Sequence, residues 1–279
     1  MTVTRLIEKR VEKVWGRRDL PEMFGGHYGG NEPLGEIWFE DPAGDAELLV
    51  KYLFTSEKLS IQVHPGDHAA KRSGHARGKD EAWIILRAEP GATIGIGLRQ
   101  PVSREQLRNA ALDGSIEQLV DWRPAAAGDI LYSPARTIHA LGPGLTLIEV
   151  QQNVDVTYRL YDYGRPRELH LDQGIEVSQR GPYESPIKAY LRPDGRKILS
   201  QGLAFILERW SGPRTESLHG AVDRPVWLVP ASGTGSISGK SMVPGSVWLA
   251  DGNASLSLAE GSELFVAYPG KNVLDDLIG

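Results

Sequence analysis

Polar side chains alternate with apolar ones in the run LSIQVH at residues 59–64, and two of them are of types that bind metals. Gln62 and His64 lie two residues apart, Ser60 lies two residues earlier, and the residues between are aliphatic. If this run is a strand, successive side chains point to opposite faces of the sheet. One face would therefore pack in a core, and the other would line a polar site.

Two further candidate ligands occur beside strand-like runs. Glu81 stands at the start of the run EAWIIL, and His139 follows the run DILYSP by a few residues. Together with Gln62 and His64 they form a set of two nitrogen and two oxygen donors, which suits zinc and is less suited to manganese or ferrous iron. The alternative is an ordinary hydrogen-bonded pair of Gln62 and His64, with His139 as a structural histidine.

The composition excludes several classes of function. The chain has 279 residues and a formal net charge of -5, and its Lys and Arg residues are scattered, so nothing indicates a nucleic-acid or membrane-surface protein. It has no cysteine, which excludes disulfides, thiolate metal sites and a cysteine nucleophile. No apolar run resembles a signal peptide or approaches the roughly 18 residues of a membrane helix. We therefore expect a cytoplasmic protein that binds small molecules or proteins.

Most elements that must position these side chains are predicted to be strands. Short runs rich in aromatic and branched residues recur along the chain, separated by Gly, Pro, Asp or Asn. Examples are ELLVKYLF, EAWIILRA, TLIEVQQN and ELFVAYPG. Many short strands at close spacing are typical of barrels and jelly rolls, so we predict a mainly β fold.

Residues 102–122 are the exception to this strand pattern. Ser103 followed by Gln106, and Ser115 followed by Gln118, both fit the capping box at the start of a helix. The segment is therefore predicted to be a short helical insertion of two helices.

A domain boundary is predicted between residues 180 and 200, where Pro, Gly and charged residues are concentrated. We predict a metal-binding catalytic domain at residues 1–180 and a smaller β-domain at residues 181–279. The second domain contains one histidine, His219, in a predicted loop, so a metal site is expected in the first domain alone.

Several ordered motifs resemble the type I mannose-6-phosphate isomerases, in their short bacterial form. The motifs are KVWG, GEIW, LSIQVHP, GKDEAW, SPARTIHALG, EVQQNVDVTYRLYDYGR and RELHL, and they span about residues 10–180. This family belongs to the cupins, so the resemblance implies a jelly-roll barrel that carries the helical insertion. The last hundred residues match only in general character, as a degenerate cupin-like β-domain.

The resemblance implies a ligand set and a reaction. One zinc ion per chain would be bound by Gln62, His64, Glu81 and His139. The enzyme would interconvert mannose 6-phosphate and fructose 6-phosphate by moving a proton between C2 and C1 through an enediol. Such chemistry needs an electrophile for the enediolate oxygen, a base and acid for the proton, and a cationic group for the phosphate.

Catalytic roles also follow from the resemblance. Lys79 would shuttle a proton or neutralise developing negative charge, and Arg159 would hold an oxyanion or the phosphate. Glu149 and Asp155 are candidates for the base or the group that orients it. Read from the residues alone, all four could equally be solvated charges on strands and loops.

Substrate-binding roles are implied for four further residues, which are Trp15, Glu36, Ser60 and Arg165. Arg165 is the candidate for the phosphate, with Arg167 and Lys188 as replacements. The substrate would be a small sugar phosphate, and the chain would be a monomer or a homodimer.

Three alternatives to this isomerase remain open from the sequence. The chain could be a non-catalytic cupin that binds a sugar phosphate, or an isomerase of a related sugar phosphate. It could also be a cupin oxygenase with ferrous iron, although Gln62 would then occupy a position that oxygen needs.

Overall fold

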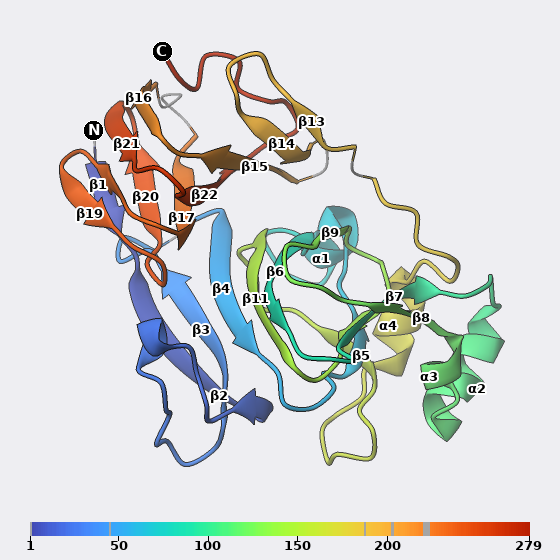
Figure 1. Cartoon of the computed structure of the whole chain (residues 1–279). Coiled ribbons are helices and arrows are strands. Elements are labelled where there is room, and N and C mark those ends of the chain that lie inside the picture. Colours follow the sequence, from blue (N-terminus) through green and yellow to red (C-terminus); the bar gives the residue numbers. More distant parts are fainter. Residues whose placement is uncertain (1, 45, 187, 202–203, 220–223) are drawn as a thin grey trace.

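The computed structural model describes residues 2–44, 46–186, 188–201, 204–219 and 224–279. Within these residues the chain is mainly β, as predicted, and its four antiparallel sheets form successive layers (Figure 1). The layers follow from the strand sequences, because most central strands are apolar on at least one face and must cover that face with another sheet.

A six-stranded sheet and a five-stranded sheet face each other around the candidate site. In spatial order, the six-stranded sheet consists of β2 (Ile7–Arg17), β3 (Leu34–Glu40), β4 (Leu48–Phe54), β11 (Leu145–Gln152), β6 (Glu81–Ala88) and β9 (Ile130–Ser133). The five-stranded sheet consists of β12 (Tyr158–Tyr161), β5 (Ile61–Val63), β10 (His139–Leu141), β7 (Thr93–Leu98) and β8 (Val120–Pro124). This pair of antiparallel sheets lies in the part of the chain for which the sequence predicted a cupin-like barrel.

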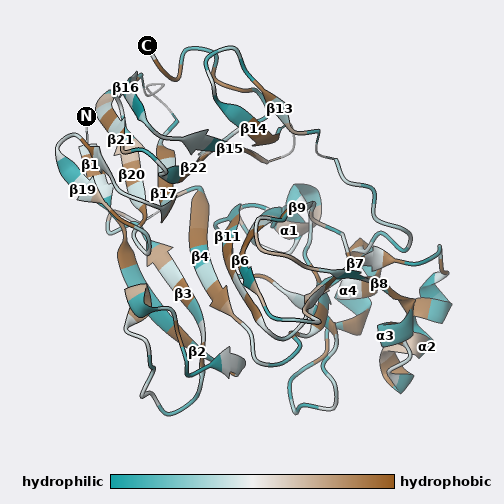
Figure 2. Cartoon of the chain, viewed as in Figure 1, coloured by the Kyte–Doolittle hydropathy of each residue, from teal (hydrophilic) through white to brown (hydrophobic). Residues whose placement is uncertain are grey.

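The central strands β4 and β11 are buried along their whole length. On the outer face, residues such as Val50 and Ile148 belong to an apolar cluster shared with the next sheet. On the inner face, Leu53 and Leu147 pack toward the five-stranded sheet, but Lys51 and Glu149 also lie there and are buried. Figure 2 shows how strongly hydrophobic β4 is around this lysine. A charge buried in such a strand requires a partner of opposite charge.

The remaining strands form two sheets that continue the stack. The seven-stranded sheet consists of β1 (Thr2–Arg5), β20 (Trp248–Asp251), β17 (Val226–Ser232), β22 (Glu263–Pro269), β15 (Phe205–Ser211), β14 (Lys197–Ser200) and β13 (Tyr190–Leu191). The four-stranded sheet consists of β16 (Arg214–Leu218), β21 (Ala254–Leu258), β18 (Gly235–Ile237) and β19 (Lys240–Met242). The strand β1 comes from the N-terminus, yet it pairs with β20 from Thr2 opposite Asp251 to Arg5 opposite Trp248. The division into domains at residues 180 and 181 remains a prediction.

The described helices are short, and the last three of them contact the five-stranded sheet. They are α1 (Asp67–Arg72), α2 (Arg104–Asp113), α3 (Ile116–Leu119) and α4 (Leu171–Val177), with a 3-10 turn at Glu22–Phe24. Both helices α2 and α3 fall within the predicted insertion. The capping box of Ser103 and Gln106 is present, but Ser115 makes no side-chain cap, so the second predicted capping box is wrong. In the part of the chain that the structure describes, every helix is too short to cross a bilayer.

Candidate metal centre and active site

Three side chains from three strands meet at a buried point between the two inner sheets. His64 directly follows β5, Glu81 is the first residue of β6, and His139 is the first residue of β10. Their donor atoms lie within 4.8 Å of one another. Nε2 of His64 is 3.2 Å from Oε1 of Glu81, and Nε2 of His139 is 3.5 Å from Oε2 of Glu81. Each of the three residues is at most 2% exposed.

The backbone orients both imidazoles. Nδ1 of His64 is 2.9 Å from the carbonyl oxygen of Val156, and Nδ1 of His139 is 2.9 Å from that of Thr137. A carbonyl oxygen can only accept, so Nδ1 donates in each ring and the lone pair of a neutral ring lies on Nε2. Both Nε2 atoms therefore face Glu81 as potential metal donors.

The charge states also favour a metal. Burial, reinforced by Lys79, lowers the pKa of His64 to about 3, and burial lowers the pKa of His139 despite the nearby Glu81. Burial would raise the pKa of Glu81, but Lys79 and the two imidazoles lower it well below its ordinary value. Two neutral imidazoles and one carboxylate are the protonation states in which these groups bind a metal.

Two of the donor atoms have no hydrogen-bond partner in the protein. Nε2 of His64 and Oε2 of Glu81 are buried and make no hydrogen bond. An unpartnered polar atom in a protein interior is costly, and a bound cation would satisfy both atoms at once. The residues present therefore fit a metal ion.

Gln62 lies beside this group through strand pairing. It is opposite His139 on β10 and opposite Arg159 on β12. Its amide nitrogen is 3.3 Å from Nε2 of His139, and its amide oxygen accepts a hydrogen bond from Ser60 at 3.0 Å. The structure thus brings Gln62 to the donor group, with its amide nitrogen rather than its oxygen nearest His139.

Lys79 is held against Glu81 by a tight loop. Its Nζ is 3.0 Å from Oε1 of Glu81, and the lysine is only 5% exposed. The preceding Gly78 lies against the backbone of the loop before α1, and a Cβ at that position would come within 2.6 Å of the backbone nitrogen of Asp67. Only glycine permits this approach, which delivers Lys79 into the site rather than into solvent.

A row of cross-strand neighbours extends the polar face over the six-stranded sheet. Glu149 on β11 is opposite Trp83 on β6 and Lys51 on β4, and Lys51 is opposite Trp38 on β3. The carboxylate of Glu149 accepts from Nε1 of Trp83 at 3.1 Å and lies 3.3 Å from Nζ of Lys51. Lys51 Nζ is also 3.8 Å from Glu36 and lies over the ring of Trp38.

Burial and the neighbouring charges shift the pKa values of the charged groups in this row. Burial and the negative charge of Glu81 raise the pKa of Glu149, although Lys51 opposes them. Burial would lower the pKa of Lys51, but Glu149 and Glu36 raise it. Burial would likewise raise the pKa of Glu36, but Lys51 and Lys13 lower it. Lys51 is therefore charged. Of the two carboxyl groups in the row, Glu149 takes up a proton more readily than Glu36, because its pKa is raised and that of Glu36 is lowered.

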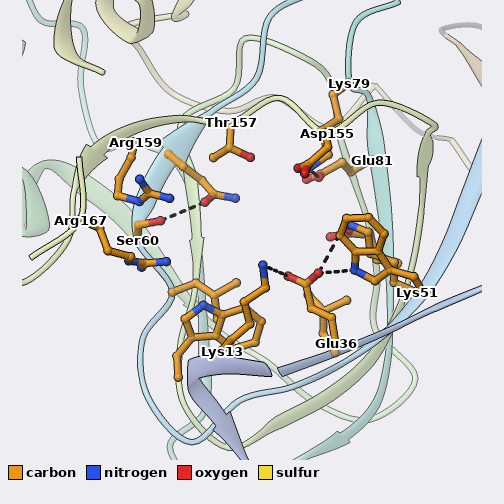
Figure 3. Close-up of a pocket in the computed structure, with 16 residues that line it drawn as sticks. Lys13, Glu36, Lys51, Ser60, Lys79, Glu81, Asp155, Thr157, Arg159 and Arg167 are labelled. Carbon is orange, nitrogen blue, oxygen red and sulfur yellow. Dashed lines mark hydrogen bonds and ion pairs between the residues drawn. The ribbon is translucent and has the colours of Figure 1, made fainter. Parts of the chain in front are cut away.

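A cavity opens onto the metal group and this row (Figure 3). Nine of the predicted site residues line it, and His64 and His139 lie against one of these, Glu81. The lining includes Trp15, Glu36, Ser60, Gln62, Lys79, Glu81, Glu149, Asp155 and Arg159. Asp155 is exposed at the cavity, whereas Glu149 is buried.

Arg165 is the predicted site residue that the structure does not bring to this cavity. Its guanidinium donates to the carbonyl oxygen of Lys58 and to Asp162. Arg167 lines the cavity instead, with two nitrogens 2.6 Å from the carboxylate of Asp162. Tyr163 and Gly164 both have positive φ, at 56° and 78°, so the chain reverses just before Arg165 and its side chain turns away.

Seven lining residues were not predicted as site residues or were predicted only as replacements, namely Lys13, Trp38, Lys51, Leu53, Leu59, Thr157 and Arg167. Lys51 carried a signal in the sequence, because a single charge in the middle of the apolar run LLVKYLF implies a buried partner. Trp38 and Thr157 lie within two of the motifs, GEIW and EVQQNVDVTYRLYDYGR, but nothing in those motifs showed that their side chains face the cavity, because that depends on strand pairing.

Comparisons with known proteins were made by sequence and by fold. The chain is 36% identical over 193 residues to a mannose-6-phosphate isomerase of Streptococcus mutans, covering 64% of this chain and 61% of the relative. It is 38% identical over 158 residues to a mannose-6-phosphate isomerase of Bacillus subtilis, covering 52% of this chain and 50% of the relative. The matches thus span between half and two thirds of the length of these curated relatives. No protein-family model matches the chain.

Solved structures extend the likeness along the whole chain. A crystal structure of the mannose 6-phosphate isomerase from Bacillus subtilis aligns with a TM-score of 0.80 and 25% identity, covering 96% of this chain and 99% of that one. The structure of a protein from Archaeoglobus fulgidus described as a mannosephosphate isomerase aligns with a TM-score of 0.75 at 17% identity, which supports the fold alone. In sequence and in fold, the chain resembles mannose-6-phosphate isomerases, as the motifs predicted.

Proposed function

We propose that this chain, which resembles mannose-6-phosphate isomerases in sequence and fold, is itself a metal-dependent isomerase of mannose 6-phosphate and fructose 6-phosphate. One observation carries the proposal: a buried group of metal donors with two unpartnered atoms reaches, through Glu81, a cavity that is also lined by Lys79, Glu149 and Arg159. A binding module would need the cavity and its cations. It would have no use for buried donors with acid and base groups beside them.

The metal we propose is zinc, one ion per chain. His64, Glu81 and His139 would hold it, with the amide oxygen of Gln62 as a fourth donor. Bound there, the ion would act as a Lewis acid toward sugar oxygens that gain negative charge. The nitrogen and oxygen donors also suit manganese and ferrous iron, so the identity of the metal belongs to the test of the proposal.

Proton transfer is assigned to Glu149. It is buried, its raised pKa brings it closer to neutral pH, and Trp83 and Lys51 fix its orientation. A carboxylate of this kind accepts and returns a proton more readily than one with an ordinary pKa. The exposed Asp155 has no such support, so we assign it to the sugar at the cavity mouth.

Lys79 is assigned to charge stabilisation. Its ammonium lies 3.0 Å from Glu81 and faces the cavity. A fixed cation at this position favours an intermediate in which oxygen atoms of the sugar become negative.

The phosphate is assigned to Arg159 and Arg167 rather than to Arg165. Both guanidinium groups line the cavity on the same side in Figure 3, and Arg159 has a buried Nε without a hydrogen-bond partner. Burial and the neighbouring Arg167 lower the pKa of Arg159, which indicates that the two cations are close. A phosphate dianion between them would relieve this repulsion and accept several charge-assisted hydrogen bonds.

The test is conversion of mannose 6-phosphate to fructose 6-phosphate by the purified protein, with bound metal measured on the same sample. Treatment with a chelator should abolish turnover, and zinc should restore it. Turnover that survives complete removal of metal would contradict the metal-dependent mechanism. Stoichiometric metal without turnover on any hexose or pentose phosphate would favour the binding module, and turnover on a different sugar phosphate would correct the substrate.

A further inference from the structure

Asp80 stands between two residues of the candidate site but points away from it. Lys79 and Glu81 face the cavity, and the alternation of an extended chain turns the intervening side chain to the outer face of the six-stranded sheet. There the two carboxylate oxygens of Asp80 accept hydrogen bonds from Oη of Tyr132 at 2.7 Å and from the backbone nitrogen of Ala135 at 2.8 Å.

The backbone of Asp80 is fixed as firmly as its side chain. Its nitrogen donates to the amide oxygen of Gln152 at 3.0 Å, and its carbonyl oxygen accepts from the nitrogen of Gln152 at 3.1 Å. Gln152 in turn donates to Asp67 at 3.2 Å. Hydrogen bonds therefore fix the backbone of Asp80 on both sides, at its peptide bond to Lys79 and at its peptide bond to Glu81.

Tyr132 connects this aspartate to the seven-stranded sheet. The tyrosine is 1% exposed, and its ring lies 5.3 Å from the ring of Phe205 on β15. Its hydroxyl donates to Asp80 and accepts from the backbone nitrogen of Ala204 at 3.3 Å. A phenol has one donor and can accept at its lone pairs, so this one hydroxyl satisfies both partners.

We propose that Asp80 and Tyr132 are positioning residues. Through them, the seven-stranded sheet holds Lys79 and Glu81 in place for metal binding and catalysis. The kinetic part of this inference rests on the proposed isomerase, whereas the metal-binding part does not. Ala204 and Phe205 contact the tyrosine, the tyrosine contacts the aspartate, and the aspartate lies between the two site residues.

The effect should be selective. Without the tyrosine hydroxyl, the part-buried carboxylate of Asp80 loses one of its two hydrogen-bond donors and keeps only the backbone nitrogen of Ala135, and the peptides that carry Lys79 and Glu81 can shift. Residues that support metal ligands typically change metal affinity or activity by about 10- to 100-fold when they are altered. The arginines that we assign to the phosphate lie on β12 and in the loop that follows it, so KM should change less than about twofold.

The first experiment compares Tyr132→Phe with Tyr183→Phe. The two substitutions remove hydroxyls from neighbouring tyrosines, but Oη of Tyr183 donates to the carbonyl oxygen of Tyr132 at 2.6 Å and does not touch Asp80. We expect Tyr132→Phe to lower zinc affinity, measured against a competing chelator, and kcat by about tenfold each, with KM unchanged. Tyr183→Phe should leave zinc affinity and kcat within about twofold of the unaltered protein. Equal losses in both variants would show a general effect of β9 and overturn the inference.

The second experiment is a double-mutant cycle with Asp80→Ala. If Tyr132 acts through Asp80, the double variant should lose no more zinc affinity and kcat than Asp80→Ala alone. Losses that multiply would mean that the two residues act independently, and would overturn the inference. If Asp80→Ala does not fold, as judged by its thermal transition, the comparison of the tyrosine variants decides the question alone.

Failure of the inference and failure of the proposed function give different results. If the unaltered protein binds zinc but converts no sugar phosphate, the proposed function fails, and the zinc affinity of the tyrosine variants still tests the positioning role. If the unaltered protein turns over and Tyr132→Phe matches it in kcat and zinc affinity, the inference fails and the proposed function stands.

Discussion

At the scale of single residues, the candidate site depends on atoms whose orientation is fixed before any metal arrives. The carbonyl oxygens of Val156 and Thr137 hold the Nδ1 protons of His64 and His139, so both Nε2 lone pairs face Glu81. Burial keeps both rings neutral. The cost of two unpartnered buried atoms is the physical reason to expect that a cation binds there.

Replacing His64 by Ala should remove the metal and the turnover together. One donor of a buried site is lost, and the remaining carboxylate and imidazole bind zinc much more weakly. The matched control is His68→Ala, because His68 is an exposed histidine on α1. Full zinc content in His64→Ala, measured by elemental analysis after gel filtration, would contradict the assignment of the ligand.

Zinc binding should release few protons near pH 6. A histidine with an ordinary pKa of about 6.5 is largely protonated at pH 6 and must release its proton before it binds a metal. The lowered pKa values of His64 and His139 instead leave both rings neutral at this pH. Glu81 is ionised as well, because its pKa is lowered. We expect titration calorimetry in buffers of different ionisation enthalpy to show less than about half a proton released per zinc at pH 6. Release of more than about one proton would mean that the rings are charged in the metal-free protein.

At the scale of the elements, strand pairing assembles the polar face from residues far apart in the sequence. Trp83, Glu149, Lys51 and Trp38 come from four adjacent strands and lie in one row across the six-stranded sheet. The opposite face of the same strands is apolar and packs against the seven-stranded sheet. Each strand therefore carries part of the site on one face and part of the core on the other.

Replacing Lys51 by Met should destabilise the protein strongly at neutral pH. The substitution leaves Glu36 and Glu149 buried without their shared cation, and breaking a buried ion pair on one side typically costs about 3–5 kcal/mol. The folded-state pKa of Glu149 is already raised and should rise further. Its protonated form is favoured on folding, so stability relative to neutral pH should be regained as the pH falls below that folded pKa.

The control for this variant is Lys9→Met. Lys9 also lies over the ring of Trp38, but it is exposed and pairs with the exposed Glu40. We therefore expect this substitution to lower the free energy of unfolding by less than about 1 kcal/mol. The measurement is the free energy of unfolding in urea at pH 5 and pH 8. A loss in Lys51→Met that is small, or that is the same at both pH values, would show that the buried carboxylates do not depend on this lysine.

At the scale of the whole molecule, one apolar cluster joins the six-stranded sheet, which carries part of the candidate site, to the seven-stranded sheet. It includes Val50 and Ile148 from the six-stranded sheet and Leu207 and Trp227 from the seven-stranded sheet. The strand β1 adds a covalent link, because the N-terminus begins in the seven-stranded sheet and continues into β2 of the six-stranded sheet. The stack in Figure 1 should therefore unfold as one unit.

Leu207→Ala should test this cooperativity. Leu207 is fully buried in the shared cluster, and such a substitution typically costs about 2–5 kcal/mol. We expect the far-ultraviolet circular dichroism and the release of bound zinc to shift together to a lower temperature in a single transition. Leu191→Ala, at a leucine that is 70% exposed, should shift neither signal. Zinc release that keeps its original midpoint in Leu207→Ala would show that the two sheets around the candidate site unfold independently of the seven-stranded sheet.

The sequence by itself determined the features that depend on local alternation and on residue type. The polar face of residues 60–64, the helices near residues 102–122 and the mainly β fold follow from patterns within a few residues of one another. Its motifs also identified the likeness that the comparisons confirm, and they pointed to Gln62, His64, Glu81 and His139, which the structure brings together.

Only the tertiary structure decided what depends on contacts between distant segments. It placed Arg167 rather than Arg165 at the cavity, because the conformation of a turn sets the direction of each side chain. It paired Lys51 with Glu149 across nearly a hundred residues, and it joined Asp80 to the C-terminal sheet through Tyr132. Periodicity assigns a side chain to a face of its strand, but strand register and sheet packing choose its partner, and those follow from the folding of the whole chain.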